Sequence, residues 1–210
     1  MSDAASQLQS PATRPSVPYD RIAPHYDRLI RPLERWFLAR LRETALRQLP
    51  QGASILELGA GTGLNFVCYP PNASGVATEP SSGMLQIAKS KPRPAQLRLV
   101  QSSAEQLPFQ NQVFSAAFAS LVFCSLASPA AAFAELRRVV KPGGTVILIE
   151  HVRPANLLGP GFDLLNLITV PLFHDHFNRR TAADAERSGL EVVKVEQSWC
   201  GIINLISCRV

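Results

Sequence analysis

The stretch Ile55-Leu56-Glu57-Leu58-Gly59-Ala60-Gly61-Thr62-Gly63 decides how the rest of the chain is interpreted. Its apolar residues predict a buried strand that runs into a turn with a glycine at every second position. Glycine adopts positive φ and carries no Cβ, so the backbone of this turn can press against a ligand. A helix expected over residues 63–68 would add free backbone N–H groups. The stretch therefore predicts a nucleotide-type cofactor site at the end of a first parallel strand.

Two acidic residues indicate which cofactor binds there. The dinucleotide fingerprint is G-x-G-x-x-G, whereas the spacing here is G-x-G-x-G and Leu64 takes the place of the third glycine. Glu57 would repel a pyrophosphate but can hold the amino group of a cationic amino-acid moiety. Glu79 ends the next apolar run, about twenty residues after Gly59, where an acid accepts hydrogen bonds from ribose hydroxyls. Together these features favour S-adenosylmethionine over a dinucleotide.

Three motifs resemble those of a known family. Glu57-x-Gly59-x-Gly61-x-Gly63, Glu79 and Val140-Lys141-Pro142-Gly143-Gly144 resemble the class I S-adenosylmethionine-dependent methyltransferases, over residues 19–210. The chain is similar to the small branch that holds quinone C-methyltransferases and bacterial phosphatidylethanolamine N-methyltransferases. The resemblance implies S-adenosylmethionine as cofactor and S-adenosylhomocysteine as product. Its motifs are poor guides to the methyl acceptor.

Composition limits the class of protein. A chain of 210 residues that is 46% hydrophobic is one globular domain with a sizeable core. The four cysteines lack paired spacing, which predicts reduced thiols; they are Cys68, Cys124, Cys200 and Cys208. Residues 1–18 lack an apolar core and predict a disordered tail rather than a signal peptide. Because no apolar run is long enough for a membrane span, we expect a cytoplasmic protein.

The net charge of +5 is concentrated near the N-terminus. Seven arginines lie between residues 21 and 47, opposed there by Asp20, Asp27, Glu34 and Glu43. This region is either a solvated helix face or a surface that draws the protein to anionic lipid on the inner face of the membrane. We expect no nucleic-acid partner, because no basic strand carries interleaved aromatic residues.

Residues 19–50 predict an N-terminal helical cap. Apolar residues recur every four positions from Leu29 to Ala45, broadened by Trp36, with Pro32 near the beginning of the stripe, where a proline is tolerated. This stripe either packs on the domain or lies in a lipid headgroup layer.

Residues 51–210 predict a doubly wound parallel sheet of the Rossmann-like α/β class, because strand and helix patterns alternate. Strands are expected at 53–58, 74–79, 96–101, 113–120 and 144–150, and helices at 63–68, 82–90, 129–140 and 179–188. The resemblance implies that Glu191–Gln197 and Ile202–Val210 form a hairpin completing a seven-stranded sheet, with the last strand antiparallel.

Residues 152–177 depart from the alternation. The run Asn156 to Phe173 is strongly apolar but interrupted by glycine and proline. We expect a lid over the acceptor pocket, with a buried helix as the alternative. The following His174-Asp175-His176 lacks a third ligand at a recognisable spacing, so no metal site is expected.

Candidate site residues gather where the strands end, because ligands of open α/β sheets bind at their carboxyl ends. The cofactor candidates are Tyr26, Glu57, Gly59, Ala60, Gly61, Gly63, Glu79, Met84, Ala104, Glu105 and Ser120. The resemblance implies that Ala104 and Glu105 contact the adenine and that Tyr26 covers the methionine end, with its ring near the sulfonium. Tyr26 is therefore also a candidate catalytic residue, with a tyrosine that anchors the helix to the sheet as the alternative. His151 is a candidate catalytic base at the end of a strand, although strand-end histidines are often structural.

Several functions are compatible with this sequence. The basic helix and the apolar segment favour methylation of a phosphatidylethanolamine-type phospholipid at a membrane surface. The alternatives are C- or O-methylation of a quinone or another small molecule, and S-methylation of a thiol. From other classes come a binding protein without turnover and an NAD-linked oxidoreductase. The scarcity of acid–base residues favours an amine or a thiol, which need little proton removal.

Overall fold

In the computed structural model of the protein, the described residues are 19–151, 179–199 and 201–210. The predicted tail 1–18, the expected lid 152–177, Cys200 and the His174-Asp175-His176 sequence lie outside them. Within the described residues, no helix is long and apolar enough to cross a membrane. The cysteines in this part of the chain, Cys68, Cys124 and Cys208, are free thiols.

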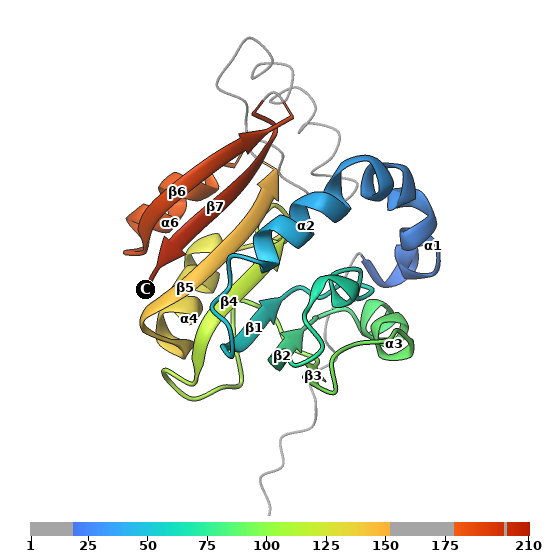
Figure 1. Ribbon diagram of the computed structural model, residues 1–210, viewed down its shortest axis with the longest axis horizontal. Helices are drawn as coiled ribbons and strands as arrows, with labels where there is room; N and C mark the ends of the chain where they lie inside the picture. The colour runs from blue at the N-terminus through green and yellow to red at the C-terminus, as the bar shows by residue number, and fades with distance from the viewer. Residues whose placement is uncertain (1–18, 152–178, 200) are drawn as a thin grey trace, which may run out of the picture.

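The described strands form one seven-stranded sheet in the order β3-β2-β1-β4-β5-β7-β6 (Figure 1). The strands are β1 Ser54–Leu58, β2 Ser74–Thr78, β3 Gln96–Val100, β4 Phe114–Ser120, β5 Val140–His151, β6 Glu191–Ser198 and β7 Ile203–Arg209. The first five pair in parallel, whereas β7 is antiparallel to both β5 and β6. The prediction of a doubly wound α/β sheet with an antiparallel last strand is confirmed. The strand order reverses between β1 and β4, which places the glycine turn after β1 at the switch point.

The helices occur mostly where the sequence predicts them. They are α1 Tyr19–Leu33, the π-helical turn η1 Glu34–Leu38, α2 Ala39–Leu46, the 3-10 turn η2 Phe66–Cys68, α3 Ser82–Ser90, α4 Pro129–Val139 and α6 Thr181–Arg187. Two begin at serine caps, because the Oγ atoms of Ser81 and Ser128 accept from the N–H groups of Met84 and Ala131.

The prediction of a helix over residues 63–68 is wrong. Backbone bonds here join residues three apart, from Gly63 N to Ala60 O at 2.9 Å and from Phe66 N to Gly63 O at 3.2 Å. Tyr69 is already extended, as expected for a residue that precedes a proline. The segment is therefore too short for an α-helix. The glycine turn is followed by a short 3-10 turn and not by the N-terminus of an α-helix.

Apolar side chains cover both faces of the sheet, as a mostly parallel sheet requires. On one face Leu56 belongs to a core that includes Phe133 of α4 and Ala185 of α6. On the other, Ile55 belongs to a core that includes Leu38 and residues of α2. Figure 1 shows α2 across one face of the sheet and α4 and α6 on the other. The alternation along β1 therefore decides which layer each side chain enters.

The N-terminal helices differ from the predicted stripe in two respects. Pro32 lies at the end of α1, just before the π-helical turn, so its expected position near a helix start is wrong. Leu29 and Trp36 are 68% and 86% exposed, whereas Leu38 and Ala45 are fully buried. The apolar residues of this segment are thus divided between the domain core and the outer surface.

Candidate active site

The glycine turn has left-handed backbone at each of its glycines. The φ angles are +62° at Gly59, +56° at Gly61 and +83° at Gly63. A Cβ on Gly59 would lie 2.5 Å from Val122 Cγ2, and one on Gly63 would lie 2.4 Å from the Phe66 ring. A Cβ on Gly61 would meet no atom within 4 Å. Gly59 and Gly63 are thus required by packing, whereas Gly61 borders open space.

Glu79 lies directly after β2 and faces the glycine turn. Its Oε2 accepts from Gly61 N at 2.8 Å, and its Oε1 accepts from Ser81 N at 2.9 Å. Burial raises the pKa of Glu79, the Ser81 and Gly61 hydrogen bonds oppose the rise, and the charge of Asp20 adds to it. The buried Glu79 carboxylate is thus held by two backbone N–H donors beside the carboxyl end of β1.

A cavity of about 110 Å³ lies between the glycine turn, α1 and the end of β4. It brings together seven of the predicted cofactor residues, namely Tyr26, Gly59, Gly61, Glu79, Met84, Ala104 and Ser120. Tyr19 and Tyr26 form one wall, with their rings edge to face and 6.5 Å between centroids. Typical ligand pockets are about 300–1,000 Å³, so a whole nucleoside cofactor requires this cavity to widen.

A larger groove, of about 750 Å³, lies elsewhere, between α2 and the segment 67–73. Its lining includes Pro50 to Ala53, which precede β1, so it lies at the amino end of that strand. Ligands of open α/β sheets bind at the carboxyl ends. We therefore assign the candidate site to the smaller cavity.

Glu57 is not among the residues that line the cavity. It is fully buried on the α2 face of β1, and its Oε1 accepts from Asn65 Nδ2 at 2.6 Å. Asn65 Oδ1 in turn accepts from Arg42, which pairs with Glu34 at 3.1 Å. Burial raises the pKa of Glu57 to about 7, against the lowering effects of Asn65, Tyr69 and Arg42. Its predicted contact with the cofactor amino group stays a prediction.

Four other candidates also lie outside the cavity lining: Ala60, Gly63, Glu105 and His151. The Glu105 carboxylate accepts from Ser128 N at 2.5 Å, at the start of α4, and its predicted contact with the adenine stays a prediction. Burial lowers the pKa of His151 to about 4, so this imidazole is neutral at pH 7 but weakly basic.

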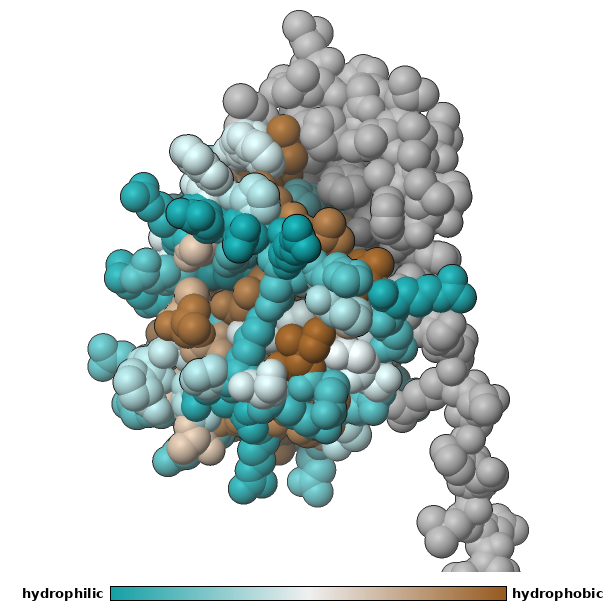
Figure 2. Space-filling view, turned by 90° about the vertical axis from the view of Figure 1, so that its right-hand side faces the viewer, coloured by the Kyte–Doolittle hydropathy of each residue, from teal (hydrophilic) through white to brown (hydrophobic). Residues whose placement is uncertain are grey.

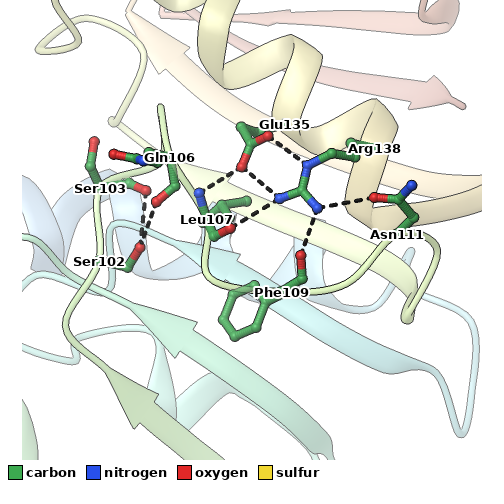
Figure 3. A network of polar contacts seen from close by, with 8 residues as sticks. All are labelled: Ser102, Ser103, Gln106, Leu107, Phe109, Asn111, Glu135 and Arg138. Carbon is green, nitrogen blue, oxygen red and sulfur yellow. Dashed lines mark hydrogen bonds and ion pairs between the residues drawn. The ribbon is translucent and has the colours of Figure 1, made fainter. Parts of the chain in front are cut away.

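An arginine of α4 fixes the loop that carries Ala104. Figure 3 shows Arg138 within a network of loop carbonyls. Its guanidinium donates to Phe109 O at 2.6 Å and to Leu107 O at 3.0 Å, and it pairs with Glu135 at 2.7 Å. The Arg138 hydrogen bond lowers the pKa of Glu135, which also accepts from Leu107 N at 2.6 Å. Loop 102–111 is thereby tied to α4.

The turn after β4 contributes residues to the cavity that were not predicted from the sequence. Leu121, Val122, Ser125 and Leu126 line the cavity together with Ser120. Leu121 has a φ of +59°, which is costly for a leucine. The buried Glu150 accepts from Val122 N and Phe123 N, both at 3.0 Å. The signal in the sequence that could have predicted this contact is Glu150, an acidic residue at the end of an apolar strand.

Comparisons with known proteins agree with this geometry. Residues 56–148 match the family described as "Methyltransferase domain". A ubiquinone/menaquinone biosynthesis C-methyltransferase (UbiE) of Syntrophotalea carbinolica is 38% identical over 160 residues, covering 71% of this chain and 65% of that one. Residues 56–148 thus form a methyltransferase domain, and the chain is similar to class I S-adenosylmethionine-dependent methyltransferases. The cofactor that this family implies is S-adenosylmethionine.

Other relatives extend the comparison. A thiol S-methyltransferase, TMT1B of Rattus norvegicus, is 29% identical, covering 68% of this chain and 62% of its own. The chain thus spans slightly less than two thirds of these curated relatives' lengths. A solved S-adenosylmethionine-dependent methyltransferase from Thermotoga maritima has a TM-score of 0.70 at 22% identity, covering 91% of this chain and 97% of that one. This likeness supports the fold.

Proposed function

We propose that this methyltransferase transfers a methyl group from S-adenosylmethionine to a small apolar acceptor of the quinone type. The observation that carries the proposal is the cavity itself, with the Glu79–Gly61 contact on one side and an apolar wall on the other. The similarity to UbiE supports the quinone alternative better than the phospholipid that the sequence favours.

The described residues fit the proposed cofactor. Glu79 would accept from the ribose hydroxyls, and the open side of Gly61 would admit the ligand against the backbone. Met84 and Ala104 would contact the adenine, and Tyr26 would cover the methionine end. The cofactor supplies an activated methyl group on a sulfonium, which an aromatic face such as that of Tyr26 attracts.

The protein contributes alignment and exclusion of water. Placing the acceptor atom in line with the methyl group supplies much of the acceleration in such a transfer. The apolar wall formed by Leu121, Val122 and Leu126 would exclude water once the ligands are bound, which strengthens electrostatic contacts. The anchored turn after β4 therefore shapes the acceptor side of the site.

A thiol acceptor is the second candidate. Among the described residues that line the cavity, the titratable side chains are Tyr19, Tyr26 and Glu79, and His151 is a weak base. A thiol needs little assistance because its thiolate forms near neutral pH. The similarity to the rat thiol S-methyltransferase favours the same candidate. The general-base role of His151 stays a prediction.

A methyl-transfer assay with labelled S-adenosylmethionine tests the proposal. Three acceptors are compared: a demethylated quinol in detergent, an alkyl thiol, and phosphatidylethanolamine vesicles. We expect the label in the quinol, and expect Glu79→Gln to abolish incorporation while Gly143→Ala retains it. Label in the thiol alone would establish the second candidate. Label in phosphatidylethanolamine alone, or in none of the three, would overturn the proposal.

A further inference from the structure

The N-terminal helices separate their charges. Three acids spaced seven residues apart are each bound within the protein. Asp20 Oδ1 accepts from Gly83 N at 2.8 Å, at the start of α3. Asp27 pairs with Lys91 at 2.5 Å, and Glu34 pairs with the buried Arg42 at 3.1 Å. Each of these carboxylates therefore has a hydrogen-bond or ion-pair partner within the protein.

The arginines that follow these acids face outward. Six arginines between residues 19 and 47 are exposed, against two carboxylates with exposed side chains, those of Asp27 and Glu43. Glu43 pairs with Arg47 at 2.5 Å. Among the described residues no ion pair involves the other five, which are Arg21, Arg28, Arg31, Arg35 and Arg40. Both exposed carboxylates are thus engaged in ion pairs of their own, and the five arginines give this segment an excess of positive charge.

Two large apolar side chains lie among the exposed arginines. Trp36 is 86% exposed and Leu29 is 68% exposed. The adjacent Phe37 instead stacks on Trp199, with 5.6 Å between ring centroids. Figure 2 views the molecule from the side on which α1 and α3 lie, and hydrophilic side chains with scattered apolar ones cover its coloured part. Arginine mixed with exposed tryptophan and leucine on a helix is typical of interfacial segments.

We propose that the outer α1 surface, defined as Arg21, Arg28, Leu29, Arg31, Arg35 and Trp36, binds an anionic lipid membrane. The positive charge complements acidic headgroups, and Leu29 and Trp36 gain an apolar environment that nucleic acid does not offer to a leucine. This favours a membrane over RNA or DNA as the partner.

This inference rests on the proposed function, because membrane contact by α1 matters for catalysis only if the acceptor is apolar. On its inner side, α1 carries Tyr19 and Tyr26, which line the cavity. An apolar acceptor partitions into lipid. A membrane-bound α1 would therefore place the site next to the phase that holds the acceptor.

Cosedimentation of the full chain with vesicles tests this surface. We expect binding to phosphatidylcholine vesicles that contain phosphatidylglycerol, a loss of binding with added salt, and little binding to phosphatidylcholine alone. One basic residue is worth a factor of about five, so Arg28→Glu with Arg35→Glu, which removes two positive charges and adds two negative ones, should weaken binding by at least about 25-fold. Arg98→Glu with Arg209→Glu changes the net charge equally on the exposed parts of β3 and β7 and should retain binding.

A spectroscopic measurement separates lipid insertion from attraction of charge alone. In the Trp199→Phe background, Trp36 emission should shift to the blue with phosphatidylglycerol vesicles. Equal weakening by the two double variants, an unshifted emission, or binding to duplex RNA or DNA without binding to vesicles would overturn the inference. Calorimetry with S-adenosylhomocysteine in the absence of vesicles reports on the proposed function separately.

Discussion

The backbone N–H of Gly61 donates to the Glu79 carboxylate, with 2.8 Å between the nitrogen and Oε2. This contact joins the turn after β1 to the end of β2, two neighbouring strand ends beside the candidate site. It also orients the Glu79 carboxylate in the wall of the cavity. The proposed binding of the cofactor depends on the position that this contact gives to Gly61 and Glu79.

Gly61→Ala should impair cofactor binding more than folding. A left-handed alanine costs about 1–2 kcal/mol, and the added methyl group would enter the open space beside Gly61. We expect the affinity for S-adenosylhomocysteine, measured by calorimetry, to fall at least about tenfold. Gly143→Ala is the matched control, because Gly143 also has positive φ, +76°, and open space around its Cβ position. Equal affinity losses in both variants would contradict the assignment of the cavity.

Arg138→Lys should destabilise the protein by about 1–3 kcal/mol, because lysine cannot reproduce the several charged hydrogen bonds to Leu107, Phe109 and Glu135. Urea unfolding measures this change. Arg187→Lys affects an exposed pair with Asp184 and should stay within about 0.5 kcal/mol. If the two substitutions cost the same, Arg138 does not fix the loop that carries Ala104.

Glu150→Gln should flatten the pH dependence of stability. Burial raises the pKa of Glu150 from 4.5 to about 7, against the opposing hydrogen bonds of Phe123 and Val122. The folded state therefore binds more protons than the unfolded state between these values. The resulting stabilisation is present below the unfolded pKa and is lost as the pH rises through about 7.

Urea unfolding at pH values on either side of this window measures the effect. Wild type should lose on the order of 2 kcal/mol more than Glu150→Gln as the pH rises. Glu191→Gln, at the exposed start of β6, should behave as wild type. A Glu150→Gln variant with the wild-type slope would show that Glu150 is ionised throughout.

The sequence predicted the sheet well because strand periodicity and glycine turns are local signals. The different surroundings of Glu57 and Glu79 could not be predicted, since both acids follow apolar runs. Glu57 lies within β1, so strand alternation directs it into the α2 layer with Ile55. Glu79 lies beyond β2 and is free to turn toward the glycine loop. Which layer covers each face of a strand depends on tertiary packing.

Two further arrangements also depend on distant partners. The Glu105 carboxylate accepts from Ser128 N at the start of α4, which is distant in sequence. The seven-residue spacing of Asp20, Asp27 and Glu34 is visible in the sequence, but the inward direction of these acids depends on α3, Lys91 and Arg42. Long-range partners of this kind leave no local pattern.

Calorimetric titration of Glu79→Gln with S-adenosylhomocysteine tests the central claim most directly. Loss of a charged acceptor for the ribose hydroxyls should weaken binding by about 10- to 100-fold relative to wild type, while Glu191→Gln binds normally. Undiminished binding by Glu79→Gln, or the absence of binding by the wild-type chain, would contradict the account.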